Sequence, residues 1–150
     1  MLELIKRSKI TANVVILDSP FDLKDFGARS SGDHIERIES VVKYYSEKFK
    51  LPIWLFGHSD GSISVSEYLN YSDRTRKSIV GAILSSGRNE IRITEDWKIP
   101  VLVMHHEKDG CVWTTFNNAK RNFAKIQKTN KANSEFATVV GGYEIGRAHV

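Results

Sequence analysis

The chain has 150 residues, 41% of them hydrophobic and 27% charged, which is the composition of one globular domain with enough apolar material for a core. Its formal net charge of +4 comes from 22 basic and 18 acidic residues interspersed along the chain, without the basic stripe that a nucleic-acid partner requires. Apolar runs stay well short of the ~20 residues needed to cross a bilayer, and charged residues occupy positions 1–10, where a signal peptide would be apolar, so we expect a soluble chain.

The first half of the chain alternates between strand-like and helix-like patterns. Residues 12–18, "ANVVILD", predict a buried strand. Asp33 followed by Glu36 forms a capping box, and an apolar stripe then predicts a helix to about residue 49. A second strand is predicted at 52–57, "PIWLFG", with Trp54 in the core. The next helix is expected to begin at Ser59 or Asp60 and to end at about Asn70.

The second half continues the alternation. Strands are predicted at 78–86, 99–106 and 135–142, a polar connection at 87–98, and a helix from about Thr115 to Gln127. The strand segments are nearly continuous in apolar character, which is typical of a parallel sheet buried on both faces. The order of elements therefore predicts an α/β fold, with helices covering both faces of a parallel sheet.

The stretch "LFGHSDGSISV" places a glycine two residues on either side of a serine, at Gly57, Ser59 and Gly61. Such a pentapeptide is a weak signal alone, but here it joins a predicted strand directly to a predicted helix. In that setting Ser59 Oγ stands at the carboxyl edge of the sheet, and the backbone N–H of Asp60 lies at a helix N-terminus that can stabilise an oxyanion. We expect both glycines to allow a close approach of strand and helix. The alternative is that Ser59 is only a helix N-cap in a glycine-rich turn.

With these residues in place, the chain resembles the α/β-hydrolase superfamily over nearly its whole length. "NVVILDSPFD", "LFGHSDGS", "IVGAILSSG" and "IPVLVMHHEKDGCVWTT" are similar to successive family elements, in the family's order. The resemblance implies that Asp109 is the acid of a catalytic triad, with Glu107 as the second candidate and an ordinary Asp-Gly turn as the alternative. It implies no cofactor. Adjacent on one strand, His105 and His106 point to opposite faces, so no metal site is expected.

The triad order of the family requires a histidine after Asp109, and only His149 qualifies. His149 belongs to "IGRAHV", which is similar to a translated sequencing adapter, so we expect residues 145–150 to be non-native and residues 1–144 to form a partial hydrolase domain. The segment before residue 12 is also shorter than relatives have. We therefore expect a piece from the middle of a hydrolase, shortened at both ends.

Three functions remain in consideration. The first is a serine hydrolase that cleaves an ester, thioester, lactone or amide through an acyl-enzyme on Ser59, with a small acyl compound as substrate. The second is a hydrolase-like scaffold that binds a small molecule without turnover. A nucleotide-binding domain is disfavoured, because no G-x-G-x-x-G follows the first predicted strand. Compartment and oligomeric state are not constrained by the sequence.

Overall fold

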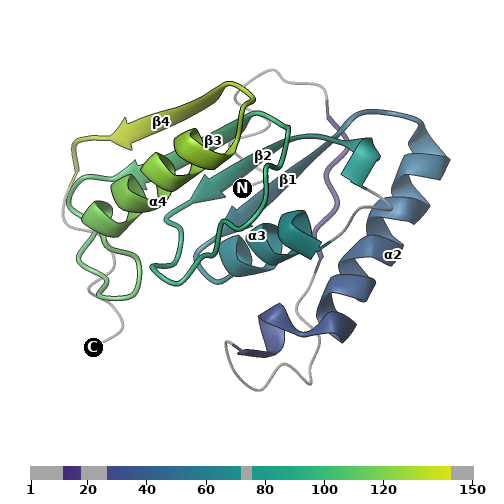
Figure 1. The fold of residues 1–150 in the computed structure, drawn as a ribbon, viewed down its shortest axis with the longest axis horizontal. Coiled ribbons are helices and arrows are strands. Elements are labelled where there is room, and N and C mark those ends of the chain that lie inside the picture. The colour runs from purple at the N-terminus through teal and green to yellow at the C-terminus, as the bar shows by residue number, and fades with distance from the viewer. Residues whose placement is uncertain (1–11, 18–26, 72–75, 143–150) are drawn as a thin grey trace.

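The computed structural model describes residues 12–17, 27–71 and 76–142 (Figure 1). Within these ranges two short 3₁₀ turns, three helices and four strands follow one another. In chain order they are η1 (Gly27–Ser30), α2 (Gly32–Phe49), β1 (Ile53–His58), α3 (Gly61–Tyr71), η2 (Arg76–Ser78), β2 (Ile79–Ser85), β3 (Val101–His106), α4 (Phe116–Thr129) and β4 (Ser134–Val139).

The four strands form one parallel sheet in the order β1-β2-β3-β4. One row of the register runs straight across it, pairing Gly57 with Leu84, Leu84 with Val103, and Val103 with Phe136. Because all strands run the same way, their carboxyl ends lie at one edge of the sheet, where open α/β folds bind their ligands. The predicted α/β class with a parallel sheet is confirmed.

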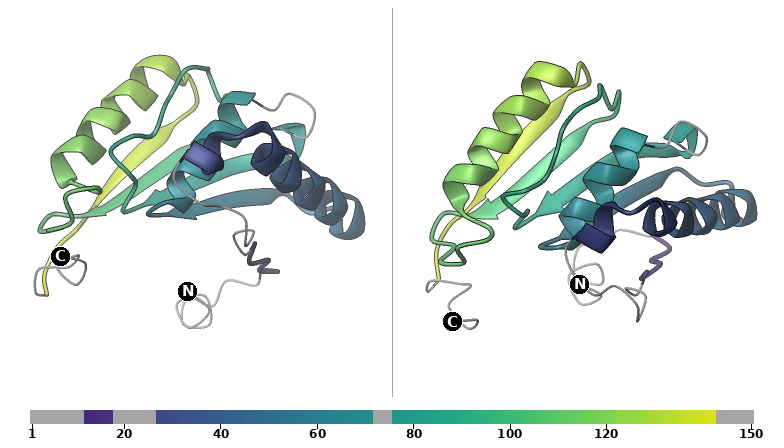
Figure 2. Two further views of the ribbon diagram at one scale, coloured as in Figure 1. Left: turned by 90° about the horizontal axis from the view of Figure 1, so that it is seen from below. Right: turned by 60° about the horizontal axis from the view of Figure 1, so that its bottom comes forward.

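The described helices that contact the sheet lie on one of its faces (Figure 2). There α3 packs against β1 and β2, α4 packs against β3 and β4, and α2 lies beyond α3. Large side chains buried in this layer include Tyr68, Leu69, Leu84 and Trp97. None of the described helices is both long enough and apolar enough to span a bilayer.

The opposite face of the sheet carries exposed apolar side chains on its first strand. Trp54 is 53% exposed, and Phe56 on β1 is exposed as well. Successive residues of a strand point to opposite faces, so Trp54 and Phe56 share the face away from α3. The prediction that Trp54 lies in the core is therefore wrong.

The predicted strand at 12–18 does not form over its described part, residues 12–17. Every one of these residues is exposed, and none of the four strands pairs with them. A strand is stabilised by ladder hydrogen bonds to a neighbour, so β-branched residues alone do not make this segment a strand. Asp18 lies outside the described residues.

Two helix ends differ from the sequence patterns. The N-cap of α2 is Ser31, whose hydroxyl accepts the His34 N–H at 3.3 Å, so the expected cap at Asp33 is wrong and Asp33 lies in the first turn instead. The apolar stripe also fades before the end of the helix, where Phe49 is exposed. In contrast, the predicted start of the last helix at about Thr115 is confirmed. The Thr115 hydroxyl accepts the Asn118 N–H and caps α4.

Candidate active site

Ser59 is the first of the two residues in the corner between β1 and α3. Its φ is 49°, in the left-handed region that non-glycine residues seldom adopt and that costs of order 1 kcal/mol or more. The Ser59 N–H still donates to Ser85 O at 3.0 Å, which extends the β1–β2 ladder by one residue. Immediately afterwards the Ser62 N–H donates to Ser59 O at 2.9 Å, which begins the helix. The chain thus turns from strand to helix within two residues, Ser59 and Asp60.

The two glycines of the pentapeptide differ in their surroundings. A Cβ on Gly57 would lie 2.5 Å from Gly61 O and 2.8 Å from Ser62 Cα, so only glycine fits beneath the turn. A Cβ on Gly61 would meet no atom within 4 Å. The close approach that we expected at both glycines therefore exists at Gly57 alone.

Two groups at the corner have unused hydrogen-bonding capacity. In the described ranges neither the Ser59 hydroxyl nor the Asp60 N–H makes a hydrogen bond. Ser59 is half-buried, and both groups precede the first turn of α3, where the helix dipole favours negative charge. The corner therefore presents a hydroxyl and a backbone donor side by side.

Asp109 lies in the loop after β3, at the same edge of the sheet, with a carboxylate that is 3% exposed. Its Oδ1 accepts the Cys111 N–H at 3.0 Å, and its Oδ2 accepts the Thr114 hydroxyl at 3.0 Å. His105 Nε2 is 3.1 Å from the same Oδ2 and donates to Thr114 O at 2.6 Å. Each carboxylate oxygen can accept two hydrogen bonds and here accepts one from the described residues, so Oδ1 retains a position for a further donor. The second candidate acid, Glu107, is exposed.

The four histidines in the described ranges all have partners other than Ser59. His34 contacts Ser64, His58 contacts Ser85, His105 lies against Thr114 and Asp109, and His106 contacts Gly141. The fifth histidine, His149, lies outside the described residues, as do the other residues of the expected non-native tail. No histidine in the described part is placed to take a proton from Ser59.

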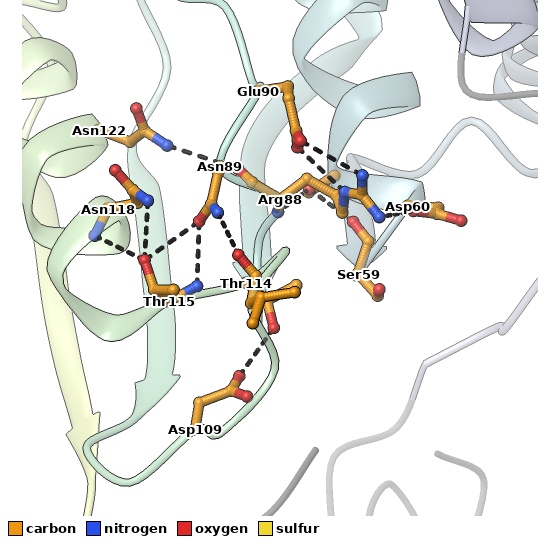
Figure 3. A network of polar contacts seen from close by, with 12 residues as sticks. Ser59, Asp60, Arg88, Asn89, Glu90, Asp109, Thr114, Thr115, Asn118 and Asn122 are labelled. Atoms are coloured by element: carbon orange, nitrogen blue, oxygen red, sulfur yellow. Dashed lines mark hydrogen bonds and ion pairs between the residues drawn. The ribbon is translucent and has the colours of Figure 1, made fainter. Parts of the chain in front are cut away.

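A segment that the sequence analysis treated as a polar connection, residues 87–98, contributes directly to the site. Arg88 is 6% exposed and lies between Asp60 and Glu90, while Asn89 contacts the loop that carries Asp109 (Figure 3). A buried arginine is not distinguishable in sequence from the charged residues around it. The only available signal was its position, two residues after the end of a predicted strand at the carboxyl edge.

The described residues contain no group of three or more histidine, cysteine, aspartate or glutamate side chains that could hold a metal ion. The groups that the described residues bring to this edge include the Ser59 hydroxyl, the Asp60 N–H and the buried Asp109 carboxylate.

No protein-family model and no curated protein matches the sequence. Solved structures do match. SOBER1 from Arabidopsis thaliana is 16% identical with a TM-score of 0.58, and the match covers 79% of this chain and 57% of that chain. An alpha-beta serine hydrolase homologue from Coxiella burnetii is 17% identical with a TM-score of 0.57, covering 74% of this chain and 50% of that one. A Bacillus cereus carboxylesterase is 12% identical with a TM-score of 0.53, covering 92% and 66%.

At these identities the likeness concerns the fold alone. The chain has an α/β-hydrolase-like fold, and its four-stranded sheet corresponds to part of the core of such structures. The chain spans 57% of the length of the Arabidopsis structure and 50% of the Coxiella one.

Proposed function

We propose that this chain carries the nucleophile and the acid of a serine hydrolase that cleaves an ester, thioester, lactone or amide through an acyl-enzyme on Ser59. One observation carries the proposal: Ser59 is held at a φ of 49° between β1 and α3, next to an Asp60 N–H that has no acceptor among the described residues. Strain of this kind persists only where the surroundings enforce it, and it concentrates at functional sites. A serine that served only as an N-cap would use its hydroxyl on the helix, and Ser59 does not.

In the proposed reaction a base takes the proton of the Ser59 hydroxyl while Oγ forms a bond to the carbonyl carbon of the substrate. Negative charge develops on the carbonyl oxygen, and the Asp60 N–H at the start of α3 stabilises it. The tetrahedral intermediate collapses when the base returns its proton to the leaving group. Water then attacks the acyl-enzyme by the same route and frees Ser59.

Asp109 is the proposed acid. It follows β3 at the edge of the sheet where Ser59 follows β1, with β2 between them. Its Oδ1 retains one acceptor position, which is what orienting a histidine N–H requires. None of the histidines in the described residues is placed to be that base, because each contacts other groups.

The alternative is a hydrolase-like scaffold that binds a small molecule without turnover. One observation favours it, namely that the described histidines are all engaged elsewhere. The neighbours include a carboxylesterase and a monoacylglycerol lipase, which act on esters, but a shared fold does not by itself imply shared chemistry.

A fluorophosphonate probe separates the two functions, because it bonds covalently to an activated serine. The 150-residue protein is incubated with the probe in the presence of imidazole, which stands in for the histidine, and the modified residue is identified by peptide mass spectrometry. We expect modification of Ser59 in preference to other serines and its loss in Ser59→Ala. Ser40→Ala, which removes an exposed hydroxyl from α2, is the control and should change nothing. Folded protein that leaves Ser59 unmodified would overturn the proposal in favour of the scaffold.

A further inference from the structure

Arg88 contacts the corner at Ser59 in two independent ways. Its main-chain N–H donates to Ser62 Oγ at 2.9 Å, and that hydroxyl donates to Ser59 O at 2.6 Å. Its side chain places Nη1 3.2 Å from Asp60 Oδ1, an atom that is buried and receives no hydrogen bond in the described part of the chain. The charge that compensates Asp60 is therefore that of Arg88.

The guanidinium of Arg88 uses each of its three nitrogens. Nε and Nη2 donate to the two oxygens of Glu90 at 3.0 and 3.3 Å, which leaves Nη1 for Asp60 (Figure 3). A fork of this kind fixes the plane of the side chain as well as its position. The side chains of Asp60 and Glu90 are 35% and 47% exposed, whereas that of Arg88 is 6% exposed. Both carboxylates therefore lie closer to solvent than the guanidinium does.

The same segment also holds the loop that carries Asp109. The ring of Trp113 lies 5.1 Å from Arg88 Cζ, a cation–π distance. The next residue, Asn89, donates from Nδ2 to Val112 O at 2.8 Å and accepts the Thr115 N–H on Oδ1 at 3.0 Å. Residues 88 and 89 thus join the nucleophile corner to the acid loop, although neither contains a reacting group.

We infer that Arg88 is a positioning residue of the proposed site: it orients the Asp60 peptide, whose N–H receives the oxyanion, and fixes its distance from the loop of Asp109. The inference rests on the proposed function. The physical reason is that a donor stabilises developing charge only when it already points at the place where charge appears, and small misplacements are costly. Lysine carries its charge on one nitrogen and cannot form the two-point fork with Glu90 while also contacting Asp60, so it restores the arrangement only in part.

The test compares the rate at which the fluorophosphonate modifies Ser59 in Arg88→Met, Arg88→Lys and the unchanged chain, with imidazole present throughout. We expect Arg88→Met to react about tenfold to a hundredfold more slowly, and Arg88→Lys to recover part of the rate. Arg92→Met is the matched control. Arg92 belongs to the same connection and forms a fork with a carboxylate of α3, Glu67, at 2.8 and 2.9 Å, but it is 64% exposed and has no contact with the corner.

A second measurement distinguishes positioning from general stability. Amide hydrogen exchange, followed by NMR, should accelerate at Asp60 and Gly61 in Arg88→Met and remain unchanged there in Arg92→Met. If Arg88→Met does not fold, Arg88→Lys carries both measurements. Equal rates of Ser59 modification in a folded Arg88 variant and the unchanged chain would overturn this inference and leave the proposed function standing. An unchanged chain that is never modified at Ser59 would overturn the proposed function, and hydrogen exchange alone would then decide whether Arg88 holds the corner.

Discussion

His34 Nε2 lies 2.8 Å from Ser64 Oγ, so a buried contact between an imidazole and a hydroxyl joins α2 to α3. Burial lowers the pKa of His34, and the positive charges of Arg29 and Arg37 lower it further. The folded chain therefore favours the neutral imidazole. Because α3 also carries the Ser59 corner at its N-terminus, this contact supports the helix on which the proposed site depends.

The first prediction concerns pH. The pKa of His34 in the fold is below its ordinary value of 6.5, so the stabilisation from a neutral His34 is complete above about pH 6.5 and is lost as the pH falls from there toward the folded-state pKa. Urea titrations should show a free energy of unfolding that decreases below that pH. His34→Gln should weaken this decrease, whereas His58→Gln, at an exposed histidine, should not. The same pH dependence in His34→Gln as in the unchanged chain would contradict the prediction.

The second prediction concerns the two glycines beside Ser59. Gly57→Ala forces a Cβ to within 2.5 Å of a backbone oxygen, so we expect it to lower the free energy of unfolding by about 1–3 kcal/mol or more. Gly61→Ala, whose Cβ meets nothing within 4 Å, serves as the control. It should leave stability unchanged or raise it slightly, because alanine restricts the unfolded chain more than glycine. Equal urea midpoints for the two variants would show that the turn relaxes around a Cβ at Gly57.

The third prediction separates a structural role of Asp109 from its proposed catalytic one. Asp109→Asn replaces one carboxylate oxygen by an NH₂ group, which cannot accept a hydrogen bond, so either the Cys111 N–H or the Thr114 hydroxyl loses its acceptor. We expect a loss of about 1–3 kcal/mol in the free energy of unfolding. Glu107→Gln, on the exposed part of the same loop, should stay within about 0.5 kcal/mol. If Asp109→Asn unfolds at the same urea concentration as the unchanged chain, the carboxylate does not hold the loop.

The fourth prediction concerns turnover. No described histidine lies against Ser59, so we expect the 150-residue protein to hydrolyse p-nitrophenyl acetate no faster than its Ser59→Ala variant does. Stoichiometric modification of Ser59 by a phosphonate does not require turnover, so the two measurements are independent. A catalysed rate that disappears in Ser59→Ala would contradict this prediction and would point to His149 or another residue outside the described ranges as the base.

The fifth prediction concerns the exposed face of β1. Phe56 is 43% exposed on an edge strand, beside Trp54, and an apolar face next to open ladder groups promotes association. Phe56→Thr introduces a β-branched residue, which suits a strand, and should reduce self-association measured by light scattering over a range of concentrations. Tyr44→Thr, at an exposed aromatic residue of α2, is the control. Equal scattering from both variants would show that the sheet face is not the associating surface.

The sequence predicted structure well where the residues that determine an element lie within that segment or the next one. Strands β1 to β4 were found because each contains a short, nearly continuous apolar run, and α4 because its apolar residues recur at helical spacing. Prediction failed where residues far apart in the sequence determine the local structure. Residues 12–17 have strand-forming side chains but none of the four strands pairs with them, and Trp54 is exposed because no described helix covers its face of the sheet.

The same division holds for the candidate site. Ser59 and Gly57 could be found from a motif because the turn is local. Arg88 could not, because its importance comes from Asp60 and Trp113, which lie 28 residues before it and 25 residues after it in the chain.

The indole of Trp54 rests on Gly81 of the neighbouring strand, where an added Cβ would come within 2.4 Å of its six-membered ring. The glycine thus lets the ring lie flat against the backbone of β2, held in place yet open to water on its other side. The fluorescence of Trp54 should therefore respond to any molecule that covers this face of the sheet. Its emission should move to shorter wavelength on contact with any apolar cover, whereas Trp97, already sealed in the interior, should keep its spectrum.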